Sequence, residues 1–351
     1  MNVEINDIRS QQEFKGVTFS NFQKSKVKAE LLKCLSMAKV ESACYWAAEL
    51  ICSAHLIDLW DCIILYCSKE IHLGSPRLPV YISKRFLDFK NIISNGYIGQ
   101  EIRLRNNIKI RNLFSELIAV LCYSNKKHSF SPVKLKKDTD FNMTDIAGKL
   151  VAPNVEFADG IFKKSDPKEL FISINEFAYH LTKTKSAVNA CYWLEWIMEF
   201  ENRCKKQKSN CDCQRRTFPP VLDKYQLDPI WIVWEIILKK IESKNNLILN
   251  KIADALLEIY CIKYTSGIKR RRRFILYFAI SLLTETYNTS IPIIENAERI
   301  SKILKSTDVV YRDVKKNEKA PATGYLDVGG AMSNLDKTIE RLEKMSTLDK
   351  F

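Results

Sequence analysis

The tetrapeptide Ala43-Cys44-Tyr45-Trp46 recurs in the second half of the chain as Ala190-Cys191-Tyr192-Trp193. Two further matches follow in the same order along the two halves: Leu59-Trp60 leading into Ile63-Ile64-Leu65 resembles Ile230-Trp231 leading into Ile236-Ile237-Leu238, and Arg111-Asn112-Leu113-Phe114 resembles Arg271-Arg272-Arg273-Phe274. Internal similarity in a constant order is the signature of repeated structural units. The three matches therefore predict two degenerate copies of one unit.

The two copies differ in length at one place. Trp46 and Trp60 lie 14 positions apart, whereas Trp193 and Trp231 lie 38 apart, so the second copy carries an insertion of 24 residues. The polar segment 201–220 belongs to this insertion. The predicted organisation is an N-terminal segment (1–21), helical unit one (22–125), a basic extended linker (126–169), helical unit two with the insertion (170–310), and a flexible tether with a C-terminal helix (311–351).

Composition and apolar spacing predict an all-α fold. Only 10 glycines and 10 prolines occur in 351 residues, whereas sheet-rich folds need such turn residues at short intervals. Apolar residues recur at steps of three and four, the period of an amphipathic helix: Leu31, Leu32, Leu35 and Ala38, then Leu113, Leu117, Val120 and Leu121, then Ile252, Ala255, Leu256 and Ile259. The repeated aromatic pairs fall within this spacing, so we interpret them as core: Tyr45, Trp46, Tyr192 and Trp193.

Polar segments separate and follow the two units. Residues 129–168 contain prolines and a lysine run, which is typical of an extended linker on the surface: Pro132, Pro153, Pro167, Lys134, Lys136 and Lys137. Residues 315–330 have the composition of a flexible tether. After Ser333, a candidate N-cap, the apolar spacing predicts a short amphipathic helix: Met332, Leu335, Ile339, Leu342, Met345 and Leu348. This helix either docks on its own body or captures a protein partner.

Several features favour an intracellular protein without membrane contact. Residues 1–15 are polar and lack the apolar core of a signal peptide. Most of the 11 cysteines stand in apolar helical stretches, as Cys52, Cys62, Cys67 and Cys122 do, which favours free thiols in a reducing compartment. The apolar run 274–283 is about half as long as the ~20 residues that a membrane span needs.

Nothing in the sequence is typical of a catalytic site. The four histidines, His55, His72, His128 and His180, stand outside known nucleophile motifs. Gly148-Lys149 is followed by Leu150 and lacks the upstream glycine of a phosphate-binding loop. We therefore expect a protein that is not an enzyme and that carries no cofactor.

The insertion contains the best metal candidate, at Cys204, Cys211 and Cys213. A structural zinc site takes four tetrahedral ligands, usually in two close pairs, and this spacing offers one close pair. We predict no metal, with zinc at these thiols as the alternative.

The basic clusters are the strongest functional signal. A formal net charge of +14 attracts polyanions, although a lysine-rich surface without a specific partner accounts for it equally well. Two cationic stretches stand at corresponding helix starts, where the macrodipole disfavours positive charge. We predict that they contact phosphates: Arg103, Arg105, Lys109 and Arg111 in unit one, and Lys269, Arg270, Arg271, Arg272 and Arg273 in unit two. The alternative is that their guanidinium groups pair with nearby carboxylates.

Two runs of unit one resemble the helical domain that follows the ATPase module in RarA-type relatives of clamp loaders: Ser42-Ala43-Cys44-Tyr45-Trp46-Ala47-Ala48-Glu49-Leu50 and Ser68-Lys69-Glu70-Ile71-His72-Leu73-Gly74-Ser75-Pro76. The chain has no counterpart of the ATPase. The resemblance implies a clamp-loader-like accessory subunit without ATPase activity, which assembles through its helical units.

A longer span resembles an uncharacterised protein family of nucleocytoplasmic large DNA viruses, from Lys15-Gly16-Val17-Thr18-Phe19-Ser20 to Ser124-Asn125-Lys126-Lys127-His128-Ser129-Phe130. This resemblance implies a cytoplasmic viral factory or a virion as the setting. The leading prediction is a non-enzymatic viral helical scaffold that binds DNA, RNA or other viral proteins in replication or virion assembly. The accessory subunit is the alternative, and an enzyme with an unrecognised site is a third.

Overall fold

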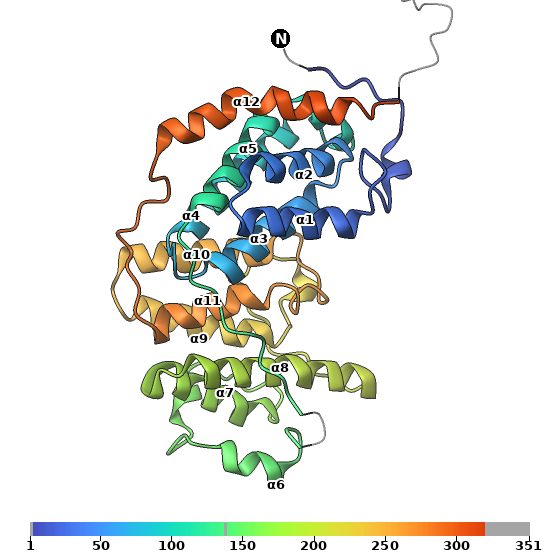
Figure 1. The fold of residues 1–351 in the computed structure, drawn as a ribbon. Coiled ribbons are helices and arrows are strands. Elements are labelled where there is room, and N and C mark those ends of the chain that lie inside the picture. The colour runs from blue at the N-terminus through green and yellow to red at the C-terminus, as the bar shows by residue number, and fades with distance from the viewer. Residues whose placement is uncertain (1–2, 137–138, 320–351) are drawn as a thin grey trace, which may run out of the picture.

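The structure, a computed structural model, describes residues 3–136 and 139–319 of the 351-residue chain. Within these residues the fold is all-α, and β-type pairing is limited to two isolated bridges, Val17 with Gln23 and His72 with Lys127. Figure 1 shows the helices stacked in a column with α12 (Ala297–Lys315) at one end and α6 (Met143–Ile146) at the other. No helix in the described ranges is both long and apolar enough to cross a membrane.

The helices of the two units pack in corresponding pairs. Unit one contains α1 (Lys24–Ser36), α2 (Val40–Cys52), α3 (Leu56–Tyr66), α4 (Leu78–Ser94) and α5 (Ile108–Tyr123). Unit two contains α7 (Leu170–Tyr179), α8 (Ala187–Gln207), α9 (Ile230–Glu242), α10 (Leu247–Cys261) and α11 (Arg273–Thr284). Helix α1 lies on α2 as α7 lies on α8, and α2 lies on α5 as α8 lies on α11. A common origin of the two units stays a prediction.

Short polar side chains determine where several helices begin. Asn107, Asn246 and Asn296 accept hydrogen bonds from backbone N–H groups in the first turns of α5, α10 and α12. Ser186 does the same for α8. The first N–H groups of a helix have no partner within it, so each cap stabilises the fold by about 0.5–2 kcal/mol.

The repeated aromatic pairs belong to the core only in part. Trp193 is fully buried, but Tyr45, Trp46 and Tyr192 are half-buried. Trp46 packs edge-on against the exposed ring of Phe22, with ring centroids 5.6 Å apart. The prediction of core packing is confirmed for Trp193, and the three half-buried rings pack against buried core residues at the edge of the core. They lie at the edge because neighbouring residues on a helix point in directions about 100° apart and do not share one face.

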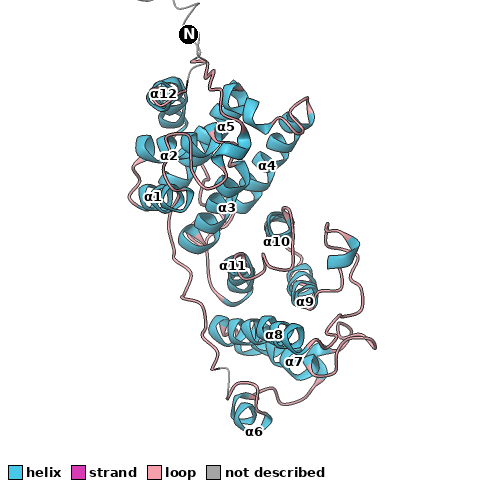
Figure 2. Ribbon diagram, turned by 90° about the vertical axis from the view of Figure 1, so that its right-hand side faces the viewer, coloured by secondary structure: helices cyan, strands magenta, loops and turns pink. Residues whose placement is uncertain are grey.

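The predicted linker is extended only in its first part. After α5 the chain runs without a helix through residue 136, along one side of the column (Figure 2). The remainder contains α6 and two short 3-10 turns and folds onto α7 and α8. The ring of Phe141 stacks on Trp196 at 4.8 Å, and the indole N–H of Trp196 donates to the carbonyl oxygen of Asp140 at 2.7 Å. Apolar side chains of this part of the linker thus pack against the core. The prediction of a wholly extended linker is therefore wrong for this part.

Helix α12 packs on unit one, although it follows unit two in the sequence. It lies against α2 and α5, as Figure 1 shows. Arg111 of α5 stacks over Tyr311 at 4.0 Å, and Arg299 of α12 stacks over Tyr123 at 3.9 Å. The predicted boundary between residues 310 and 311 falls inside this helix and is therefore wrong. The predicted C-terminal helix at 332–348 lies outside the described residues.

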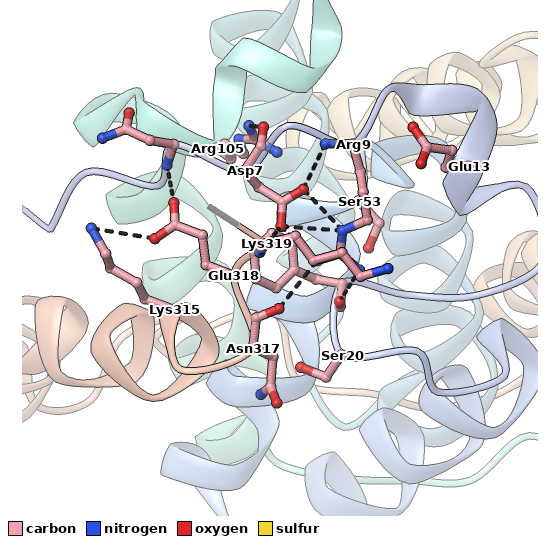
Figure 3. Close-up of polar contacts among 12 residues, drawn as sticks. Asp7, Arg9, Glu13, Ser20, Ser53, Arg105, Lys315, Asn317, Glu318 and Lys319 are labelled. Atoms are coloured by element: carbon pink, nitrogen blue, oxygen red, sulfur yellow. Dashed lines mark hydrogen bonds and ion pairs between the residues drawn. The ribbon is translucent and has the colours of Figure 1, made fainter. Parts of the chain in front are cut away.

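A buried polar clasp joins the N-terminal segment to the end of α12 (Figure 3). The Asp7 carboxylate accepts hydrogen bonds from the Arg9 guanidinium at 2.6 Å and from the backbone N–H of Lys319 at 2.8 Å. Arg9 also donates to the carbonyl oxygen of Asn317 at 3.2 Å. Arg105 donates to the carbonyl oxygen of Asp7 at 2.7 Å. Residues 3–9 are thus a structural part of unit one rather than a separate segment.

The segment that resembles the RarA-type helical domain lies at the seam between the two units. The N–H of Lys127 donates to the carbonyl oxygen of Ile71 at 3.0 Å, and the N–H of Ser129 donates to that of Lys69 at 2.8 Å. The buried ring of His72 packs against Phe278 of α11 at 4.8 Å. Two backbone carbonyl oxygens and the His72 ring of this segment are thus engaged inside the protein, whereas the side chains of Lys69 and Glu70 are half-buried.

Replacing Gly74 with alanine is expected to destabilise the fold by about 1–3 kcal/mol, the usual cost of overpacking. A Cβ at this position would lie 2.4 Å from the backbone carbonyl oxygen of Asn125, and backbone cannot move aside as a flexible side chain can. Urea unfolding monitored by tryptophan fluorescence measures the loss. Gly267→Ala is the control, because a Cβ there meets nothing within 4 Å. Equal stability of the Gly74 variant and wild type would contradict the prediction.

Candidate nucleic-acid interface

The structure separates the nine predicted phosphate contacts into two groups. Four are buried: Arg105, Arg111, Lys269 and Arg272, with exposures between 2% and 8%. Four are exposed and one is half-buried: Arg103, Lys109, Arg270 and Arg271, then Arg273. Only the second group is placed where a phosphate of a large ligand could reach it.

In unit one, two of the four predicted contacts hold the protein's own backbone. Arg111 donates from Nε to the carbonyl oxygen of Arg105 at 2.6 Å, and its other face covers Tyr311. Arg105 is engaged in the clasp with Asp7. The prediction of phosphate contact is therefore corrected for Arg105 and Arg111, because their charges are enclosed by carbonyl oxygens and aromatic rings. Arg103 and Lys109 stay exposed, and Arg103 donates to the Gln100 side chain at 2.8 Å.

In unit two, carboxylates of the protein itself neutralise most of the five consecutive cations. Lys269 is buried with Glu201 of α8 and lies 3.1 Å from Asp228. Arg270 pairs with Glu199, and Arg273 pairs with Glu195 at 3.1 Å. Burial raises the pKa of Glu195, although Arg273 and the hydroxyl of Tyr277 oppose this shift. The alternative reading, pairing with nearby carboxylates, thus holds for these three cations.

Arg272 joins the two units from inside. Its guanidinium pairs with Asp61 of α3 at 3.1 Å and donates to the carbonyl oxygens of Tyr260, at 2.9 Å, and of Ile262. Burial lowers the pKa of Arg272, an effect that the Asp61 carboxylate opposes. The prediction of phosphate contact is therefore corrected for Lys269 and Arg272, whose charged groups the fold encloses.

Two neighbouring segments of unit two carry exposed cations, which we call the basic rim. It combines the end of α8 with the loop before α11 and consists of Lys205, Lys206, Lys208, Lys263, Arg270 and Arg271, all exposed. The bonds of Glu199 and Glu201 to residues 270 and 269 hold the end of α8 beside this loop. The bond from Arg272 to the carbonyl oxygen of Ile262 closes the loop, so its two ends lie together. The sequence analysis predicted phosphate contact for only two of these six residues, Arg270 and Arg271.

Four members of the rim have no carboxylate partner among the described residues: Lys206, Lys208, Lys263 and Arg271. Between Lys263 and Arg271 the loop exposes Thr265, Ser266 and Gly267. Lysine and arginine side chains, hydroxyl groups and backbone N–H groups are the usual partners of nucleic-acid phosphates. The rim therefore has the chemistry of a phosphate-binding surface.

A buried ion pair holds the inserted loop in place beside the rim. Arg216 is 2% exposed and donates from Nη2 to Asp166 at 2.7 Å and from Nε to Glu235 at 3.2 Å. Burial alone would raise the pKa of Asp166, but Arg216 and the N–H groups of Lys163 and Gln214 hold it below its usual value. The ion pairs of Arg216 thus attach the insertion to the rest of unit two.

The candidate zinc thiols lie inside this insertion. Cys204, Cys211 and Cys213 are all buried and free. Burial and the neighbouring Cys204 raise the pKa of Cys211 to about 12, which disfavours the thiolate that a metal needs. The described residues contain no group of three or more histidine, cysteine or acidic side chains that could hold a metal ion.

Comparison of the chain with protein-family models, curated proteins and solved structures found no match.

Proposed function

We propose that this protein is a non-enzymatic helical scaffold that binds nucleic acid through the basic rim. The observation that carries the proposal is that two segments with six exposed cations, the end of α8 and the loop before α11, lie beside each other. Their neighbours Lys269 and Arg272 are buried and shape the loop. Buried cations thus shape the loop, and four of the six exposed cations have no carboxylate partner among the described residues that would compete with phosphates.

Charge supports the same proposal. The chain carries a formal net charge of +14, and the rim concentrates part of this excess where four cations lack carboxylate partners in the described part of the chain. Binding to phosphates releases condensed counterions and is therefore favourable at low salt. The end of α8 and the loop before α11 are held together by the buried pair of Lys269 with Glu201 and by the more exposed pair of Arg270 with Glu199.

The proposed setting is a viral factory or a virion, and it rests on the resemblance to the large-DNA-virus family. The alternative, a clamp-loader-like accessory subunit, rests on residues 68–76. Their backbone is engaged with residues 127 and 129 at the seam, so no surface of that segment favours the alternative. A protein partner of the C-terminal helix stays a prediction, because that helix lies outside the described residues.

Salt titration of duplex DNA binding tests the proposal. We expect the triple variant Lys206→Ala, Lys208→Ala and Arg271→Ala to reduce the slope of log affinity against log salt by about 3, since each lost phosphate contact removes about one unit. Fluorescence anisotropy of a labelled duplex of about 20 base pairs at several salt concentrations, beginning near 50 mM, measures this slope.

The matched control removes three exposed lysines from unit one: Lys26, Lys33 and Lys39. It changes the net charge equally but leaves the rim intact. The proposal fails if wild type binds neither duplex nor single strand at the lowest salt, or if both triple variants change the slope equally.

A further inference from the structure

The insertion exposes an aromatic ring next to the basic rim. Phe218 is 38% exposed, and Phe22 of unit one is the one other aromatic residue classed as exposed in the described ranges. Phe218 lies between two exposed cations of the same loop, Arg215 and Lys224. A single exposed apolar side chain is ordinary on a protein surface, and what distinguishes Phe218 is the combination of an aromatic ring with nearby cations.

The ring is supported from inside the protein. Phe218 makes an edge-on contact with the buried Trp231, with ring centroids 6.4 Å apart. Trp231 in turn contacts Tyr264 at 5.0 Å. Tyr264 directly follows Lys263, so this series of rings connects Phe218 to the loop of the rim.

Charges surround the same rings. Tyr225 packs on Tyr264 at 5.5 Å, and the ammonium of Lys224 lies 5.0 Å from the Tyr225 ring. Arg215 pairs with Asp223 at 2.7 Å, although both side chains stay largely exposed, and its Nε donates to the Gln226 side chain at 2.5 Å. Near Phe218 the loop thus presents one cation without a carboxylate partner among the described residues, Lys224, and one exposed ion pair, Arg215 with Asp223.

The loop that carries Phe218 is tied at both ends. The N–H of Cys213 donates to the carbonyl oxygen of Leu227 at 2.8 Å, and the N–H of Arg216 donates to that of Gln226 at 3.1 Å. The side chain of Arg216 binds Asp166 and Glu235 below the loop. A ring held this way loses little conformational entropy when a flat partner stacks on it.

We infer that Phe218 is a stacking platform for a base of single-stranded nucleic acid whose phosphates lie along the basic rim. The inference rests on the proposed function and specifies its ligand. Stacking on an aromatic side chain beside a cationic groove is how proteins bind single strands without reading sequence. In a duplex the bases are stacked inside the helix, so Phe218 would not contact them. Phosphates of either form can reach the rim.

The test compares Phe218→Ala with wild type on two probes, a single-stranded oligothymidylate of about 20 nucleotides and a duplex of the same length. We expect the single-strand affinity to fall about 5- to 150-fold, because one base–aromatic stack contributes about 1–3 kcal/mol. The duplex affinity and the salt slopes should stay unchanged. Phe218→Trp should keep or increase single-strand affinity, since every base stacks on an indole.

Phe22→Ala is the matched control, because it removes the other exposed phenylalanine far from the rim in the sequence. Thermal melting shows whether the Phe218 variants are folded, and the tryptophan variant keeps the test decisive if the alanine variant unfolds. Unchanged single-strand affinity of Phe218→Ala, with duplex binding retained, would overturn this inference and leave the proposed function standing. Absence of binding to both probes at low salt would overturn both.

Discussion

Replacing Arg216 with alanine is expected to lower the free energy of unfolding by about 3–5 kcal/mol. The guanidinium and its partner Asp166 are both almost fully buried, with side-chain exposures of 1% and 0%. Removing the cation leaves a buried carboxylate without its counter-ion, and the two backbone N–H groups that still bind it compensate its desolvation only in part. Urea unfolding followed by circular dichroism measures the loss. The variant should also weaken single-strand binding, because the loop that carries Phe218 loses its anchor.

Arg215→Ala is the matched control. Arg215 precedes Arg216 and also pairs with an aspartate, but the side chains of Arg215 and Asp223 are 49% and 78% exposed. An exposed pair of this kind contributes about 0–1 kcal/mol. Equal losses for the two variants would contradict the argument from burial.

The pH dependence provides a second check on Arg216. In wild type the pKa of Asp166 lies below its usual value, so the pair stabilises the fold above about pH 4, and this stability is lost as the pH falls through the folded pKa. In Arg216→Ala the pKa of Asp166 rises relative to wild type, because only the N–H groups of Lys163 and Gln214 then oppose the effect of burial. Protonation then relieves the buried charge, so the stability difference between variant and wild type should narrow below about pH 5. A difference that is constant with pH would contradict this account.

Replacing Asp7 with alanine is expected to cost a similar amount, about 3–5 kcal/mol. Its carboxylate is the common acceptor of the clasp, binding the Arg9 guanidinium and the backbone N–H of Lys319. Without it, the buried cation of Arg9 loses its counter-ion and the end of α12 loses an anchor. Hydrogen exchange should therefore accelerate most at the last turns of α12, and unfolding in urea should shift to lower concentration.

Asp7→Asn separates charge from hydrogen bonding, because the amide oxygen still accepts from the backbone. We expect it to destabilise less than Asp7→Ala. Asp313→Ala is the surface control, since Asp313 pairs with Lys316 in solvent and the two side chains are 52% and 75% exposed. Faster exchange spread evenly over both units, without preference for α12, would contradict the clasp's local role.

The candidate site was predictable only in part. The arginine-rich stretch before α11 drew attention to the correct loop, and Arg270 and Arg271 belong to the rim. The same pattern also included Lys269 and Arg272, which are buried. Sequence spacing does not reveal this difference, because the partners are carboxylates of α8 and α3 that lie far away along the chain.

No sequence pattern comparable to the arginine-rich stretch drew attention to Phe218. It stands in a polar segment beside Pro219 and Pro220, where an isolated aromatic residue is ordinarily read as an anchor of the loop. Its exposure depends on Trp231 filling the space below it and on the ion pair of Arg216. A combination of basic and aromatic residues within a long insertion is the pattern that could have indicated it.

The sequence by itself determined that the chain forms helices, because a period of three to four apolar residues and the scarcity of glycine and proline are local properties. The matches that start from the Tyr-Trp pairs predict two copies of one unit, and this duplication stays a prediction. Only the tertiary structure decided that α12 returns to unit one and which cations face solvent. The physical reason is that burial and ion pairing depend on groups distant in the chain. A charge is enclosed or exposed according to what the fold brings beside it.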